Sequence, residues 1–308
     1  MTTSTPFVEV TVFGLAAGAV FGLLALGLVL IYRTTGVLNF AHWAVGLLSI
    51  VGYSFLAKTG MPTPLAAVLS IGFSVGAGVV AYRLVFRRLH RANQVIVILI
   101  SIGMAGLLSS LAQMVLGFAA FTQIPSWLPV NDLRLGRVSV RSTEIFTAAA
   151  AVAVAFGFLV WFRASMTGRA LRAVAQNREA ATLAGIDEVR HSMIAWGIGS
   201  GLAALALLMV LPHAAGEQGG LITVIDLTPF GTLLIPAFGA ALVGGLVNLP
   251  MALAGGFVFG LARELLVLAP KPWSDLRSSI AAILIVTLLL LRTERFFATR
   301  QELEALEL

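Results

Sequence analysis

Val12–Tyr32, with the sequence VFGLAAGAVFGLLALGLVLIY, runs for 21 residues without a charged side chain. A helix needs about 20 mostly apolar residues to cross the hydrocarbon core of a bilayer. The whole chain has this character, because 59% of its 308 residues are hydrophobic and only 11% are charged. An average soluble domain carries roughly 25% charged residues. The composition therefore predicts an all-α, polytopic membrane protein.

Nine apolar runs are candidates for membrane-spanning helices. The second, seventh and eighth are Gly-rich or interrupted, so we expect eight or nine full spans in a single transmembrane domain, residues 1–308. The runs cover residues 9–32, 37–57, 63–86, 94–117, 143–162, 190–212, 229–247, 250–269 and 276–292.

The basic residues indicate the orientation of these spans. If the loop that carries Arg83, Arg87, Arg88 and Arg91 is cytoplasmic, thirteen of the 20 Lys and Arg residues lie inside and seven outside. Positive charge favours the cytoplasmic side, so we expect a multi-pass protein of the cell (inner) membrane with its N-terminus outside and its C-terminus inside. The formal charge of +6 is spread over the ends of apolar runs, which argues against a nucleic-acid partner.

Residues for catalysis or metal binding are scarce. The chain has no Cys, and its four histidines, at positions 42, 90, 191 and 213, include no pair with metal-ligand spacing. The sequence also has no G-x-x-x-x-G-K-[ST] phosphate loop. We therefore expect neither an enzyme nor a cofactor or metal site.

Two segments differ from plain spans. In RTTGVLNFAHWAVG, residues 33–46, Asn39 and His42 lie a short way into an apolar run, and Trp43 follows them. Residues 226–248 are interrupted by Pro, which removes a helical donor, and by Gly, which loosens the helix. The candidate pathway residues of this second segment are Pro229, Gly231, Pro236, Gly244 and Gly245.

One interrupted segment in each half of a membrane protein is typical of a transport site. Irregular backbone at membrane depth is tolerated only where protein or a water-filled cavity satisfies it. We therefore predict that Asn39, His42 and Trp43 border a substrate pathway opposite the second interrupted segment. Two alternatives stay open. The Gly-rich stretches allow close helix packing, and Asn39 and His42 could brace the broken segment through hydrogen bonds to a neighbouring helix.

The segment RASMTGRALRAVAQNREAATLAGIDEVR, residues 163–190, is too polar to cross a membrane. Its alanines favour a helix that opens near Gly168. A second short helix fits Glu179–Ala184, ended by Gly185 at a position where φ > 0 is often needed. One face of this element is charged and the other is apolar. Such an element either seats in a groove of a partner protein or lies on anionic lipid.

Three blocks of the sequence carry a family pattern. Gly14–His42 reads G-x-x-x-G-x-x-x-G-L-x-A-L-G-x-x-L-x-Y followed by G-x-x-N-F-A-H, and Gly168–Ile186 reads G-R-A-x-R-A-x-A-x-N-x-x-A-A-x-x-x-G-I. The third block is the Gly-rich stretch Val243–Glu264. Together, and in this order, the blocks resemble the permeases of branched-chain amino acid ABC importers.

The resemblance implies a permease subunit that moves a small polar solute by alternating access. It implies ATP hydrolysis in two separate cytoplasmic ATP-binding subunits, a second permease subunit (identical or a sister chain) and a solute-binding protein outside. The 163–190 segment would then hold a cytoplasmic coupling helix that contacts an ATPase. The coupling residues implied are Gly168, Ala170, Arg172, Ala173, Asn177, Glu179, Ala180, Ala181 and Gly185.

The chain departs from the family at Trp43 and Ala44, where many members have Gly and an acidic residue. This removes a carboxylate partner for a substrate ammonium group, so a branched-chain amino acid, urea and a small amide all stay open as solutes. The rival function is an ion-coupled secondary transporter. Such proteins usually bury carboxylates in their spans, and Glu264 is the only acid clearly within a late apolar run.

Overall fold

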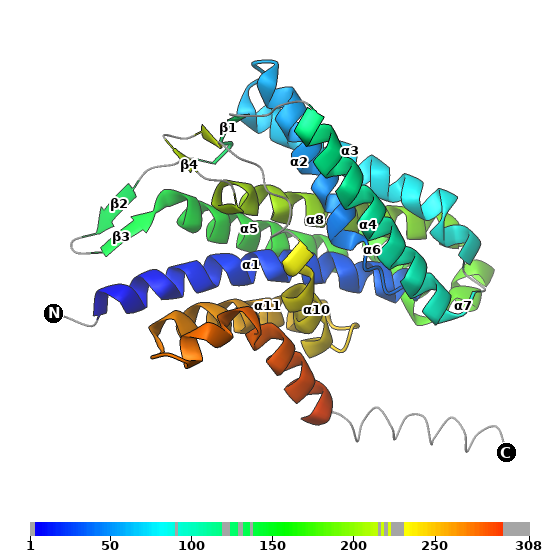
Figure 1. Ribbon diagram of the computed structural model, residues 1–308. Coiled ribbons are helices and arrows are strands. Elements are labelled where there is room, and N and C mark those ends of the chain that lie inside the picture. The colour runs from blue at the N-terminus through cyan, green and yellow to red at the C-terminus, as the bar shows by residue number, and fades with distance from the viewer. Residues whose placement is uncertain are drawn as a thin grey trace.

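A computed structural model describes residues 4–89, 92–118, 124–128, 132–135, 138–214, 217–218, 221–222 and 231–291 (Figure 1). Within these residues, six helices are long and apolar enough to cross a membrane. They are α1 (Ser4–Thr35), α3 (Thr63–Leu84), α4 (Gln94–Phe118), α5 (Ser142–Ala164), α8 (Glu188–Ala214) and α11 (Leu249–Leu265).

Shorter helices occupy the remaining apolar runs, so each of the nine predicted runs contains a helix. They are α2 (His42–Lys58), α10 (Leu234–Val243) and an apolar helix at Ile280–Leu291. The polar segment between α5 and α8 forms α6 (Met166–Gln176) and α7 (Arg178–Leu183). Three 3-10 turns complete the helical part: η1 (Phe86–Leu89), η2 (Leu266–Leu268) and η3 (Trp273–Ser278).

Short strands, which the sequence did not predict, connect the helices at one end of the molecule (Figure 1). β1 (Ile124–Pro125), β5 (Leu221–Ile222) and β4 (Glu217–Gln218) form an antiparallel sheet in the order β1-β5-β4. β2 (Asp132–Leu135) and β3 (Val138–Arg141) form a hairpin. Two side chains fix this layer to the helices, because the Tyr53 hydroxyl donates to the Pro125 carbonyl (2.7 Å) and Trp127 Nε1 donates to the Leu208 carbonyl (2.8 Å).

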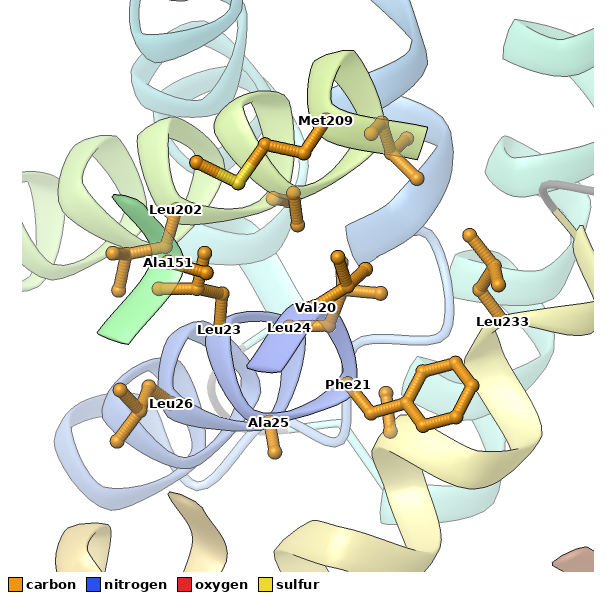
Figure 2. Close-up of a cluster of buried hydrophobic side chains, with 14 of the residues drawn as sticks. Val20, Phe21, Leu23, Leu24, Ala25, Leu26, Ala151, Leu202, Met209 and Leu233 are labelled. Carbon is orange, nitrogen blue, oxygen red and sulfur yellow. The ribbon is translucent and has the colours of Figure 1, made fainter. Parts of the chain in front are cut away.

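The core is built around α1, which packs against α5, α8, α10 and α11. Most of its side chains from Ala16 to Ile31 are buried. Figure 2 shows Val20, Leu23 and Leu24 of α1 facing Ala151 of α5 and Met209 of α8. The first long apolar run of the sequence is therefore the central helix, surrounded by protein instead of lipid.

Helix α11 packs antiparallel against α1 through glycines spaced four residues apart. A Cβ atom added at Gly256 would lie 2.4 Å from the Gly22 nitrogen, and one added at Gly260 would lie 2.3 Å from the Gly18 nitrogen. Only residues without a Cβ allow two helix backbones to approach this closely. For α11, small-residue packing thus accounts for the glycines of the block that ends at Glu264.

Helices α3, α4 and α5 present wide apolar faces to the outside of the subunit. Exposed side chains on these faces include Phe73 (58% exposed), Leu99 (63%) and Phe156 (67%). A soluble monomer rarely exposes contiguous apolar surface of this kind. The exposed faces therefore support the assignment of the chain to a membrane.

Candidate functional site

The chain between α1 and α2 is held by a compact turn. Gly36 follows α1 with φ of +71°, a conformation that favours glycine. The Asn39 side chain is 2% exposed, and its Oδ1 accepts a hydrogen bond from the Ala41 backbone nitrogen (3.0 Å). The Phe40 nitrogen donates to Ser101 Oγ of α4 (3.2 Å). Asn39 thus closes a local turn at the start of α2.

His42 is enclosed between three helices. Its side chain is 1% exposed, and a Cβ atom added at Gly27 of α1 would lie 2.7 Å from both His42 Nε2 and Cε1. The same position lies 2.9 Å from the Gly199 carbonyl of α8. The Leu24 backbone of α1 interacts with the His42 ring. Asn39 and His42 are thus both buried inside the subunit.

The aromatic side chains next to Asn39 and His42, those of Phe40 and Trp43, contact the second interrupted segment. The Phe40 and Phe238 ring centroids lie 5.6 Å apart, and a Cβ atom added at Gly231 would lie 3.5 Å from the Trp43 ring. The structure thus brings the first interrupted segment against the second. Pro229 lies outside the described residues.

Three predicted pathway residues of the second segment belong to the helical hairpin of α10 and α11. Pro236 lies in the first turn of α10, where a missing N–H breaks no helical hydrogen bond. Gly244 begins the turn between the helices. The position requires a glycine, because a Cβ atom there would lie 2.4 Å from the Asn248 carbonyl oxygen. Gly245 has φ of +61° in the same turn, and the Asn248 side chain caps α11 by accepting from the Met251 nitrogen (3.1 Å).

A cavity of about 420 Å³, which the sequence analysis missed, lies near the N-terminal half of α1. One wall is apolar and comes from Phe13, Ala17 and Phe21 of α1, Met209 of α8 and Leu233 before α10. Ligand sites commonly have volumes of roughly 300–1,000 Å³ and mostly apolar walls. The cavity therefore has the size and the wall of a small-molecule site.

The lining of the cavity also includes two acids and two arginines. Glu144 of α5 and Glu264 of α11 are buried, with exposed fractions of 4% and 7%. Arg277 of η3 forms an ion pair with Glu264, and Arg263 Nε lies 3.8 Å from the same carboxylate. The arginine side chains are 43% and 39% exposed, so the charged wall reaches the surface. The only sequence signal for this site was Glu264, an acid inside an apolar run.

A hydroxyl also faces this cavity. Thr147 of α5 lines it, is 2% exposed, and its Oγ1 has no hydrogen-bond partner among the described residues. A buried hydroxyl without a partner costs free energy. Within the described part of the chain, no group of three His, Asp or Glu side chains is placed to hold a metal ion.

At the opposite end of the molecule, α6 and α7 are fastened to the ends of three long helices. Arg172 of α6 donates to the carbonyls of Phe162 and Arg163 at the end of α5 (3.2 Å to Arg163). Arg178 of α7 donates to the Thr34 carbonyl of α1 (2.9 Å) and pairs with Glu188 of α8 (3.0 Å). Side chains of α6 and α7 therefore bind the backbones of α5 and α1 and a carboxylate of α8.

The caps of α6 and α7 differ in part from the sequence expectation. α6 begins at Met166 and not at Gly168, because Ser165 Oγ accepts from the Gly168 nitrogen (2.9 Å) and caps the helix. Gly168 is a glycine for another reason, since a Cβ there would lie 2.1 Å from the Phe162 carbonyl. Gly185 has φ of +81° after α7, as predicted.

The predicted coupling residues divide into three groups by their exposure. Gly168 and Ala181 are buried against the rest of the chain. Asn177, Glu179, Ala180 and Gly185 are exposed, and Ala170, Arg172 and Ala173 are half-buried. Two exposed apolar residues of the same segment, Met166 (75% exposed) and Leu183 (90% exposed), lie outside this set.

A family model described as "branched-chain amino acid transport system / permease component" matches residues 10–293. The chain belongs to this permease family. The curated relatives of this permease include BraD of Pseudomonas aeruginosa, a high-affinity branched-chain amino acid permease protein. It is 28% identical over 271 residues, which cover 83% of this chain and 85% of BraD. The permease proteins named LivH from Escherichia coli K12 and Salmonella typhimurium are each 28% identical over 275 residues, covering 82% of this chain and 83% of LivH.

Proposed function

We propose that the permease is the membrane-spanning subunit of an ABC importer for a small polar solute, with a branched-chain amino acid as the first candidate. The observation that carries this proposal is the family match over residues 10–293. The relatives BraD and LivH are named as branched-chain amino acid permeases and align over more than four fifths of this chain. Alternating access would be powered by ATP-binding subunits, because this sequence contains no phosphate loop of its own.

We further propose that α6 and α7 form the coupling element that contacts an ATP-binding subunit. Leu183 and Met166 offer exposed apolar side chains for a groove in the partner. Glu179 and Ala180 lie exposed near Leu183 on α7. The hydrogen bonds of Arg172 and Arg178 to the ends of α5 and α1 support this role, because they connect a docking surface to the transmembrane helices.

The membrane orientation proposed from the sequence is supported by the arginines at the C-terminal ends of three helices. Arg33, Arg83 and Arg163 lie in the last turns of α1, α3 and α5. These three helix ends gather around α6 and α7 (Figure 1). Positive charge marks the cytoplasmic side, so this end would face the cytoplasm and the N-terminus the outside.

We propose nine traversals of the membrane, the seventh with a broken helix. The ten residues of α10 extend about 15 Å, which is half of the roughly 30 Å hydrocarbon core. Helix α10 therefore ends or begins within the membrane, where irregular backbone needs a cavity or protein around it. An incomplete helix of this kind is common at transporter sites.

For the route itself, we propose that the contact between the α1–α2 connection and α10 borders the pathway in an assembly with a second permease subunit. Trp43 and Gly231 would lie along this border, and Asn39 and His42 would hold it from inside. Asn39 closes the turn before α2 and His42 fills the gap beside Gly27, which supports a positioning role for both.

Co-purification with the cognate ATP-binding subunits tests the proposal. In nanodiscs, the permease–ATPase complex should hydrolyse ATP faster when the leucine-loaded solute-binding protein is added. The unloaded binding protein is the matched control. A permease that binds no ATPase, or a complex whose hydrolysis ignores the loaded binding protein, would contradict an importer of this class.

The second candidate function, an ion-coupled secondary transporter, has one observation in its favour. Glu144 and Glu264 are buried carboxylates, and buried acids often carry ions or protons in such transporters. Glu264, however, is paired with Arg277 and lies near Arg263. The family match argues for the importer.

A further inference from the structure

A second cavity, of about 220 Å³, lies at the end of the molecule that carries α6 and α7. Residues from the end of α1, from α3 and η1, and from the first turns of α7 and α8 line it. The rings of Tyr82 and Phe86 form part of its apolar wall. The transport function proposed above gives this cavity no role of its own.

The polar lining of this cavity has an excess of positive charge. Arg87 and Arg178 line it together with one acid, Glu188. The Glu188 carboxylate is already neutralised by its ion pair with Arg178 (3.0 Å). Arg87 is exposed, and so are its neighbours in the sequence, Arg83 and Arg88. An anion that enters the cavity is therefore attracted by the lining and by the surface around it.

Arg178 can bind such an anion and keep its present contacts. A guanidinium group has five N–H donors. The structure shows Arg178 Nη2 donating to the Thr34 carbonyl and Nη1 pairing with Glu188, which leaves donors for a ligand. Guanidinium groups bind phosphate oxygens through pairs of hydrogen bonds. A phosphate group is thus the anion that two arginines at one cavity fit best.

The surroundings of the cavity favour a lipid as the source of the phosphate. The α3 side chains of Val80 and Leu84, close to the cavity in the sequence, are 52% and 54% exposed. They belong to the wide apolar face that α3 presents to the outside of the subunit. Basic pockets between transmembrane helices on the cytoplasmic side bind the headgroups of anionic lipids. The acyl chains of such a lipid can lie along α3 while its phosphate reaches the arginines.

We propose that this cavity binds the phosphate of an anionic phospholipid from the cytoplasmic leaflet. The phosphate lies between Arg87 and Arg178, and the acyl chains lie against the exposed face of α3. Because Arg178 also holds α7 to α1 and α8, the bound headgroup steadies the coupling segment against the transmembrane helices. The inference rests on the proposed orientation of the permease and is independent of the solute that it carries.

The test measures lipid retention by native mass spectrometry of the purified permease, alone and with its ATPase. Dioleoyl phosphatidylglycerol is the anionic probe, and dioleoyl phosphatidylcholine has the same acyl chains without the net charge. The permease should retain phosphatidylglycerol in preference to phosphatidylcholine, and Arg87→Gln should weaken phosphatidylglycerol binding about fivefold. Arg88→Gln is the matched control, because Arg88 is the next residue and equally exposed but does not line the cavity. Equal lipid binding by the two variants would overturn the site.

Two further outcomes identify other occupants of the cavity. Inorganic phosphate in large excess should displace little of the lipid, since it lacks the acyl chains. Complete displacement would show a site for a soluble anion and overturn the lipid assignment. If Arg87→Gln lowers co-purification of the ATPase and leaves lipid retention unchanged, the cavity belongs to the protein interface and the proposal is wrong. Lipid retention is measured without transport, so failure of the importer assay leaves this inference standing, and the reverse also holds.

Discussion

Replacing Gly260 by alanine should separate α1 from α11. The added Cβ would lie 2.3 Å from the Gly18 nitrogen and 2.4 Å from the Gly14 carbonyl. Ordinary contact begins at 3.4 Å, so a backbone must move by about 1 Å. Overpacking of a tight interface typically costs about 1–3 kcal/mol. The helix preference of alanine over glycine, about 1 kcal/mol, offsets only part of this cost.

Gly157→Ala is the matched control for this experiment. Gly157 lies in the interior of α5, and a Cβ added there meets no atom within 4 Å. The Gly260 variant should lose several degrees of thermal stability in size-exclusion measurements of the heated, detergent-solubilised protein. The Gly157 variant should match or exceed the parent. Equal melting temperatures for the two variants would refute the close α1–α11 contact.

Three further predictions concern the coupling segment and the turn before α2. Leu183→Asp should abolish co-purification of the ATPase while the permease still folds. Ala181→Asp should instead lower the yield of the permease itself, because Ala181 is buried. Normal ATPase binding by the Leu183 variant would argue against docking at α7. A single cysteine that replaces Glu179 should react with a membrane-impermeant thiol reagent only after cells are opened. Labelling in intact cells would show that the permease has the opposite orientation in the membrane. Asn39→Ala should lower thermal stability and leave transport per folded complex unchanged, because the Asn39 carboxamide only closes a turn. A stable variant with poor transport would place Asn39 in the pathway.

Much of the fold could be predicted from the sequence, because a bilayer imposes its length on every helix that crosses it. Each apolar run contains a helix, and the alanine-rich polar segment forms α6 and α7. Two of the runs that were ambiguous in the sequence, 37–57 and 229–247, form the short helices α2 and α10, whereas the third forms α11, which is long enough to cross a membrane. Composition could not show which helix is central, since α1 and α4 are equally apolar runs but only α1 is surrounded by protein.

The candidate site was only partly predictable. The two interrupted segments were recognised because Pro, Gly and isolated polar residues disturb an apolar run, and the structure places Phe40 and Trp43 of the first against the second. Whether a polar side chain faces the transport pathway or fills the protein interior depends on the direction in which it points, and the sequence spacing does not give that direction. His42 shows this, since it fills a gap that Gly27 leaves in α1.

The charged cavity escaped prediction for a different reason. Glu144 and Arg277 are separated by more than 130 positions in the chain, and each stands near the end of its helix, where a charged residue is ordinary. Only the folding of α5, α11 and η3 around α1 brings these groups to one cavity. The close glycine contact of α1 with α11 also positions Glu264, because a Cβ atom added at Gly14 would lie 3.4 Å from the Glu264 Cβ atom.

The central claim, that this permease works in an ATP-driven importer, is tested most directly by uptake of tritiated L-leucine into proteoliposomes. The vesicles hold the permease with its ATPase, and the solute-binding protein is added outside. Leucine uptake is expected to require ATP inside the vesicles and to cease with a hydrolysis-deficient ATPase. Leucine uptake by the permease alone, driven by a proton or sodium gradient without ATPase, would contradict it.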